Sequence, residues 1–576
     1  MNLSSGANQT IEKPLWFGPD ARVLAGWLTR PTTDHIRGGV VCASPIGREA
    51  RAGRRAIRQI AVTLAEAGFA TLRFDFDGTG DSSGEFNDAE RDSYWVNSVV
   101  EATNLLRSLG AASVSAVGMR LGATLLGVAA DRCAVGFTSL VLWDPCESGR
   151  SYLRELTALE ALRREDFEIV AGGPLETSEY VFMPRAVEEI RHLDLSATKS
   201  ESLAPRTLVM ARDDRAVSER LRTNLNRAHV EWMTTSEQAA LLDVDPLLAE
   251  LPDLTVERIS KWLLESPVTE TRFNAPRLMD RAVVSRSPGF EVNEHFVELG
   301  AQRLFGIVSE PTGDVRGPLI VMFNVANEEH IGPARLWVEL SRRWSSLGLR
   351  CVRFDLRGLG DSPWTLGQPN PPDYFHAWLD DITDVAHELS PDDPSNVVLV
   401  GLCSGAFWAI EAGLALGAQG VCALNPPVST DFLHALGRLQ RSSRSWVRGL
   451  GARLEPLGMR RWDAAALWHV SRAVLPKWYA ASTLERLNDD GVDLFLTYTT
   501  DDISPFQRVP FLRSMDVRRL SDTNFRHIEF LPRVDHALHS ADGRVRAIDL
   551  LDRHILQRFS GVTMEEGFSP KSEDGP

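Results

Sequence analysis

The sequence predicts an α/β fold that is built twice, giving two tandem domains that each consist of a mostly parallel sheet flanked by helices. Two observations lead to this prediction. A ten-residue motif occurs twice, and each copy stands in an alternation of short β-branched runs and longer helical stretches. The chain of 576 residues also exceeds what one hydrophobic core organises, so two large domains are expected.

The repeated motif occupies Arg73–Ser82 and Arg353–Ser362, with seven of ten positions identical and an offset of 280 residues. Two further pairs of segments match at offsets of 283 and 288, and these are Gly118–Ala123 with Gly401–Ala406 and Arg212–Asp214 with Thr500–Asp502. An offset that grows slowly along the chain is expected of a duplicated domain with small loop insertions.

The two copies are placed at residues 14–265 and 290–560, with a proline-containing linker at 266–289. The polar, acidic segment 561–576 is expected to be a disordered tail.

Short apolar runs and the longer stretches between them define the expected elements of each copy. In the second copy the expected strands are 319–323, 352–355, 397–401 and 421–424, and the expected helices are 334–347 and 374–389. In the first copy the corresponding strands are 39–43, 71–75, 113–118 and 140–143.

The composition is that of an ordinary globular protein, with 43% apolar and 24% charged residues. A net charge of -16 disfavours nucleic acid as a partner. Neither a leader nor a membrane span is recognised, so a cytoplasmic location is expected. The six cysteines are scattered without CxxC pairs, so they are expected to be reduced, and neither a metal nor another cofactor is expected.

Cys403 lies at the centre of a strand, a G-x-C-x-G turn and a helix, with the turn at Gly401–Gly405. This is the layout of a nucleophile elbow, in which small flanking residues let a strained turn present one side chain above the sheet edge. A thiol suits the role, although most free cysteines are merely small buried side chains. The motif therefore favours Cys403 as a catalytic nucleophile.

With these motifs the sequence resembles the α/β-hydrolase superfamily, and specifically its serine-aminopeptidase-like and acylglycerol-lipase-like members. The resemblance covers nearly all of both copies. It departs from the family pattern in having Cys403 where a serine is usual. It implies two α/β-hydrolase domains, each with a helical lid insertion, and the lid of the second copy is expected at about 428–479.

The resemblance also implies an acid and a base after the nucleophile, in that order along the chain. Asp502 follows an apolar strand and is the expected acid, with Asp501 as its alternative. His536 follows a further strand end and is the expected base, while nearby His539 is the competing histidine. His536 would take the thiol proton, and Asp502 would orient the ring.

An oxyanion hole is expected from two backbone N–H groups near the nucleophile. One is that of Ser404, and the other comes from Val325 or Asn324 after the 319–323 strand. Asp355 and Asp361 stand in a glycine-rich loop and are expected to serve turns rather than catalysis.

The first copy has Arg120 at the nucleophile position, and a guanidinium is always protonated and cannot attack a carbonyl. Asp214 remains at the acid position, but no histidine corresponds to His536, and His229 comes too early in the chain. Arg120 either pairs with Asp214, which is favoured, or receives an anionic ligand group. The first domain is accordingly expected to be a pseudo-enzyme.

The expected lid is locally basic. Residues 432–477 contain nine arginines and lysines against two acidic residues, a local charge of +7. The cations either form a solvated face or receive an acyl carrier protein or a coenzyme A thioester, with Arg441, Arg444 and Arg448 as the candidate contacts.

The sequence therefore predicts an enzyme that cleaves a small ester or thioester through an acyl-enzyme, with hydrolysis as the leading outcome. One alternative is an acyltransferase that passes the acyl group to an alcohol or amine, as the use of cysteine by some superfamily members implies. The other is a non-catalytic binding or assembly protein.

Overall fold

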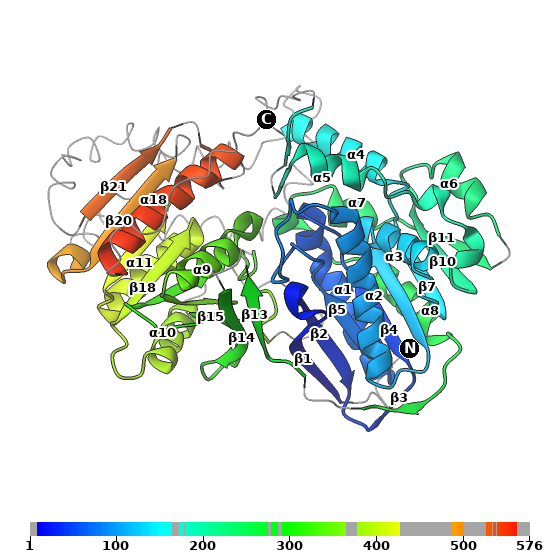
Figure 1. Ribbon diagram of the computed structural model, residues 1–576, viewed down its shortest axis with the longest axis horizontal. Helices are drawn as coiled ribbons and strands as arrows, with labels where there is room; N and C mark the ends of the chain where they lie inside the picture. Colours follow the sequence, from blue (N-terminus) through cyan, green and yellow to red (C-terminus); the bar gives the residue numbers. More distant parts are fainter. Residues whose placement is uncertain are drawn as a thin grey trace, which may run out of the picture. The chain divides into compact units, whose positions relative to one another are not determined.

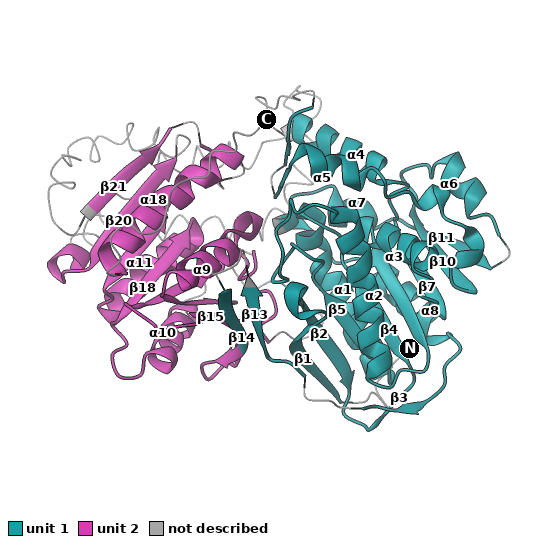
Figure 2. Ribbon diagram, in the orientation of Figure 1, with its two compact units in different colours: residues 1–296 teal, residues 297–576 magenta. Residues whose placement is uncertain are grey.

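The computed structural model describes residues 9–560 except 164–171, 178, 228, 275–277, 286–290, 327, 364–376, 427–485, 500–525, 533, 537 and 539. The chain divides into two compact units, Met1–Phe296 and Val297–Pro576 (Figure 2). The division falls within strand β14, which spans Glu291–Leu299. The sequence-based boundaries at 265 and 290 stay a prediction.

The first unit contains an eight-stranded sheet (Figure 1). The first two strand pairs are antiparallel and the remaining neighbours are parallel. In spatial order the strands are β1 (Thr10–Phe17), β2 (Leu24–Pro31), β5 (Ala70–Phe74), β4 (Gly39–Ala43), β6 (Val114–Met119), β7 (Ser139–Trp143), β10 (Arg206–Arg212) and β11 (Val230–Thr235).

Helices cover both faces of this sheet, so its central strands are apolar throughout, as in β4, where every residue is buried. One core cluster includes apolar residues of α2 (Arg91–Ser108) and α3 (Leu121–Arg132). The other includes α1 (Arg48–Glu66) and α8 (Asp253–Leu264). The other helices and strands of the first unit include β3 (His35–Ile36), α4 (Gly149–Arg163), β8 (Leu175–Glu176), β9 (Val181–Phe182), α5 (Pro184–Ile190), α6 (Glu219–Asn224), α7 (Gln238–Leu242) and β12 (Thr271–Arg272).

The second sheet has nine strands, of which β13 and β14 form an antiparallel pair at one edge. Strand β15 is antiparallel to β17, and the strands from β17 onward are parallel to their neighbours. In spatial order the strands are β13 (Arg281–Ser285), β14, β15 (Leu304–Pro311), β17 (Arg350–Phe354), β16 (Leu319–Phe323), β18 (Val397–Leu402), β19 (Gly420–Leu424), β20 (Asp493–Thr499) and β21 (Arg526–Leu531).

Among the residues that the structure describes, four longer helices cover the second sheet. One core cluster contains residues of α10 (Ala377–Leu389) and α11 (Ser404–Leu416), and the other contains residues of α9 (Leu336–Ser346) and α18 (Ala541–Phe559). Helix α18 begins after Ser540, whose Oγ accepts a hydrogen bond from the Gly543 backbone N–H at 3.2 Å. Its buried residues recur at helical spacing, which places one apolar face on the sheet.

The two sheets share one strand order. The strands of each sheet can be numbered in chain order, starting at β1 in the first sheet and at β14 in the second. The spatial order is then 1-2-4-3-5-6-7-8 in both sheets. The predicted fold class is confirmed, because each unit is a mostly parallel sheet flanked by helices. The lid expected at 428–479 lies outside the described residues.

The expected strands agree with β4 to β7 and β16 to β19 within two residues. The helix expected from 334 begins instead at Leu336, after a short 3-10 turn, Pro333–Arg335. Ala334 and Arg335 have positive φ angles of 49° and 67°, which an α-helix cannot contain. The pattern of apolar residues carries no sign of this turn.

Candidate functional site

Cys403 stands between the end of β18 and the start of α11. Its φ of 54° and ψ of -117° are unusual for a residue with a side chain, and such strained residues are concentrated at functional sites. Its backbone N–H donates to the Leu424 carbonyl at 2.9 Å, which fixes the turn to the neighbouring strand. The thiol is half-buried at the carboxyl-terminal edge of the sheet.

Glycines on both sides make this turn sterically possible. A Cβ on Gly401 would clash with the backbone of Gly405. A Cβ on Gly405 would lie 2.8 Å from the carbonyl oxygen of Asn324, which belongs to the loop after β16. The small residues of the G-x-C-x-G motif are therefore needed for close backbone approach.

The same turn occurs in the first unit with an arginine at its centre. Arg120 follows β6 and precedes α3, with φ of 54° and ψ of -123°. Its N–H donates to the Trp143 carbonyl at 2.9 Å, just as Cys403 bonds to Leu424. The two units thus present different side chains from one backbone geometry.

The loop after β16 contacts the first residue of α11. The backbone N–H of Ala326 donates to Ser404 Oγ at 2.7 Å. The first N–H groups of α11, including that of Ser404, have no acceptor within the helix, which suits them to bind developing negative charge. Val325, in the same loop, is 7% exposed.

Asp355, at the end of β17, holds this loop in place. It is fully buried and accepts hydrogen bonds from Asn324 Nδ2 at 2.7 Å and from the N–H groups of His330 at 2.7 Å and Asp361 at 2.9 Å. The buried ring of His330 adds a contact, with Nδ1 2.8 Å from Asp355 Oδ2. The expected oxyanion loop is thereby anchored in the core.

Asn425 links the loops that follow the last strands. Its N–H donates to the Thr497 carbonyl at 2.7 Å, and its Oδ1 accepts from the Thr499 N–H at 2.8 Å. Its Nδ2 donates to the His536 carbonyl at 2.8 Å. Because Asn425 follows Leu424, the partner of Cys403, these bonds connect the Cys403 turn with the backbone of His536.

Part of the predicted site lies outside the described residues. This holds for Asp501, Asp502, His539 and the lid residues Arg441, Arg444 and Arg448. Cys403, Ser404, Val325 and His536 are described, and the backbones of Cys403 and His536 belong to one hydrogen-bonded edge of the sheet. Their catalytic roles stay predictions.

Arg120 is 5% exposed and binds three carboxylates. Its Nε donates to Glu49 Oε1 at 2.8 Å, Nη1 lies 3.4 Å from Asp144 Oδ2, and Nη2 pairs with Glu155. The favoured pairing of Arg120 with Asp214 is wrong. Asp214 accepts instead from Arg212 at 2.7 and 2.8 Å, a residue only two positions away in the chain.

A cavity of about 200 Å³ is lined by Arg120 and Glu49 together with Tyr152, Tyr180 and Arg212. Arg120, in the wall of this cavity, occupies the position that Cys403 has in the second unit. Since a guanidinium carries no nucleophilic lone pair, this side chain cannot form an acyl-enzyme. In the described structure Arg120 forms ion pairs.

Residues 330–548 match the model of the Alpha/beta hydrolase family. The matched segment lies within the second unit and includes Cys403, Asp502 and His536. It supports the expectation that this part of the chain is an enzyme of the hydrolase type.

Similar solved structures include Est1E from Butyrivibrio proteoclasticus with ferulic acid bound. It is 16% identical, with 44% of this chain and 98% of that chain covered and a TM-score of 0.35. One of two fungal esterases from Rhizomucor miehei is 18% identical over 45% of this chain and 84% of that chain, with a TM-score of 0.32. A Pyrococcus furiosus esterase is 14% identical over 44% and 91%, with a TM-score of 0.33. Among curated proteins no sequence matches this chain.

Sequence reasoning missed Asn425 and His330. Asn425 has a detectable signal, since it directly follows the 421–424 strand, where the first unit has Asp144 after the 140–143 strand. His330 has no counterpart in the repeat, and its pairing with Asp355 follows only from the folded loop.

Replacing Asn425 by aspartate, the residue of the first unit, should impair the site without unfolding it. The new carboxylate still accepts a hydrogen bond from the Thr499 N–H. It has no N–H to donate to the His536 carbonyl, so that hydrogen bond is lost. We expect kcat/KM for an activated ester or thioester to fall about tenfold. The control Asn396→Asp changes an amide whose Oδ1 accepts a hydrogen bond from exposed Gln419 Nε2 at 2.8 Å. Equal activity of both variants would exclude a role for the Asn425 bond.

Burial raises the pKa of Asp144 to about 6, even though nearby Arg120 lowers it. Between the ordinary value of 3.8 and about 6 the folded state binds the extra proton, so the free energy of unfolding falls as pH rises through this window. We expect Asp144→Asn to be more stable than the parent at pH 7, by on the order of 1–3 kcal/mol.

This advantage should vanish near pH 4, where Asp144 is protonated in the folded state. Denaturant unfolding at both pH values measures it, with exposed Asp213→Asn as the control. A difference that does not depend on pH would contradict the burial argument.

Proposed function

We propose that the second unit is an acyl-transfer enzyme in which Cys403 is the nucleophile, His536 the base and Asp502 the acid. The observation that carries this proposal is the strained turn at Cys403, at the edge of the sheet to which Asn425 ties the His536 backbone. A strained turn of this kind needs a compensating use, because a positive φ at a residue with a side chain costs about 1–3 kcal/mol.

In the proposed reaction His536 takes the thiol proton as Cys403 Sγ attacks the carbonyl carbon of an ester or thioester. The N–H groups of Ser404 and of Val325 or Asn324 bind the oxyanion. The bond to the leaving group breaks, and the leaving group receives the proton from His536. Water, activated by His536, then attacks the Cys403 thioester and releases the acid.

Hydrolysis is the outcome we propose first, with a thioesterase or esterase as the enzyme class. Transfer of the acyl group to an alcohol or amine follows the same first half-reaction and differs only in the acceptor. Product formation with and without an added amine or alcohol separates the two. The finer resemblance, to serine-aminopeptidase-like and acylglycerol-lipase-like enzymes, is part of this proposal.

We propose that residues 14–265, within the first unit, are a duplicated domain without catalysis of its own. The shared strand order and the backbone angles of Arg120 and Cys403, which have the same φ of 54° and ψ angles of -123° and -117°, support a common origin. The three carboxylates around Arg120 support a structural use of the former nucleophile position. The alternative of a wholly non-catalytic protein fails if Cys403 turns over a substrate.

No helix in the described part of the chain combines the length and apolar character that a membrane span requires. The proposed substrate is a small ester or thioester. The cytoplasmic location stays a prediction.

The replacements Cys403→Ala and His536→Ala should each lower kcat/KM roughly a thousandfold or more, because nucleophile and base act as one unit. Cys133→Ala, at an exposed thiol, and His387→Ala, at an exposed helix position, are the matched controls. Steady-state hydrolysis of an activated thioester provides the measurement. The proposal is overturned if both active-site variants retain the activity of their controls.

The arginines of the lid segment provide a separate prediction. Reversing Arg441, Arg444 and Arg448 to glutamate should raise KM for a substrate carried by coenzyme A or an acyl carrier protein about tenfold or more. Attraction of an acidic carrier then turns into repulsion. A short neutral thioester serves as the control substrate, for which KM should not change. An unchanged KM for both substrates would exclude a carrier-binding role.

A further inference from the structure

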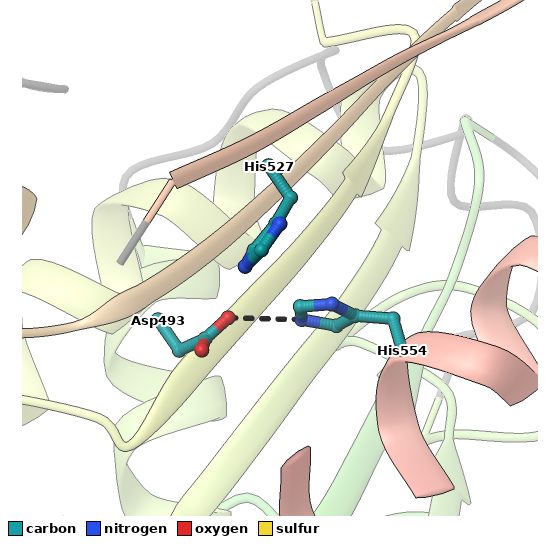
Figure 3. Close-up of side chains that lie close together, drawn as sticks. All are labelled: Asp493, His527 and His554. Carbon is teal, nitrogen blue, oxygen red and sulfur yellow. Dashed lines mark ion pairs between the residues drawn. The ribbon is translucent and has the colours of Figure 1, made fainter. Parts of the chain in front are cut away.

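Asp493, His527 and His554 lie close together (Figure 3). They lie where the last two strands begin, at the opposite end from the Cys403 edge. Asp493 is the first residue of β20, His527 the second of β21, and His554 lies near the end of α18. One ligand atom from each residue lies within 4.8 Å of the other two. Figure 3 shows the His527 ring pointing toward the gap between the Asp493 carboxylate and the His554 ring.

Two buried atoms of this cluster form an ion pair whose geometry is not that of a hydrogen bond (Figure 3). Asp493 Oδ1 and His554 Nε2 are 2.9 Å apart, and both side chains are 6% exposed. Neither atom has a hydrogen-bond partner of acceptable geometry. A metal ion would take a lone pair from each of the two atoms in place of this direct contact.

The separation of these two atoms suits a metal ion. Two ligand atoms at about 2.1 Å from one ion subtend about 90° when they are 2.9 Å apart, as cis ligands do. Two imidazoles and one carboxylate form a donor set that zinc, cobalt and nickel accept.

The surroundings fix the orientation of the two buried ligands. Phe495 stacks on the His554 ring with centroids 4.5 Å apart. Arg558 Nε donates to Asp493 Oδ2 at 2.6 Å, which leaves Oδ1 facing the histidines. Partners of this kind orient ligands in metal sites, and exposed His527 provides an entry path from solvent.

We propose that Asp493, His527 and His554 bind a divalent transition-metal ion, with water in the remaining positions of an octahedral site. The ion would join β20, the edge strand β21 and α18 at the start of both strands. Asp502 and His536 follow these two strands in the chain. The ion would therefore stabilise the strands at the end opposite to the proposed catalytic residues. It is independent of the proposed reaction.

The test uses the full-length protein, freed of metal with a chelator and titrated with Zn²⁺ by calorimetry, and with Co²⁺ by visible absorption. The variant His527→Gln removes the exposed ligand and should fold normally. His387→Gln, at an exposed histidine of α10, is the matched control. We expect one equivalent of metal on the parent and the control, and an affinity about tenfold or more weaker for His527→Gln.

Thermal unfolding gives a second measurement. Added Zn²⁺ should raise the Tm of the parent and of His387→Gln, because an ion bound only to the folded chain stabilises it, and it should raise the Tm of His527→Gln less. Asp493→Asn, which retains an oxygen acceptor for Arg558, should behave like His527→Gln. Equal Zn²⁺ affinity of the parent and His527→Gln, or no binding to the parent, would overturn the proposal.

Discussion

The second unit depends on one backbone constraint, the positive φ of Cys403 between β18 and α11. Parallel strands buried on both faces end together at one edge, and the chain must turn sharply there to start the covering helix. The turn exists only because Gly401 and Gly405 allow the backbones of α11 and the β16 loop to approach. Its hydrogen bond to Leu424 then sets the position of the thiol relative to the neighbouring strand ends.

The loops around this turn are held by buried polar side chains. Asp355, which follows β17, accepts hydrogen bonds from Asn324, His330 and Asp361. These bonds hold the loop beside Ser404 against the end of β17. Asn425 does the same for the loop of His536. Fixed loops matter for the proposed chemistry, because an oxyanion site is effective when its donors need no rearrangement. In the first unit the same turn carries Arg120, and surrounding carboxylates turn the position into an ion-pair cluster.

Much of the fold could be predicted from the sequence, because buried parallel strands appear as short apolar runs and the repeat places corresponding runs in both halves. The turn at Cys403 was predictable for the same reason, since only small residues fit beside it. The positive φ angles of Ala334 and Arg335 before α9 could not be predicted, because the periodicity of apolar residues carries no signal for a turn this short. Nor could the partners of Arg120, since Glu49 and Glu155 come from segments far away in the chain.

The central claim is that Cys403 forms a covalent acyl-enzyme, and intact-mass measurement after mixing with an activated thioester tests it most directly. We expect the protein to gain the mass of one acyl group, located by peptide mapping to Cys403 and absent from Cys403→Ala. An unmodified Cys403 during turnover, or an adduct confined to exposed Cys133, would contradict the account.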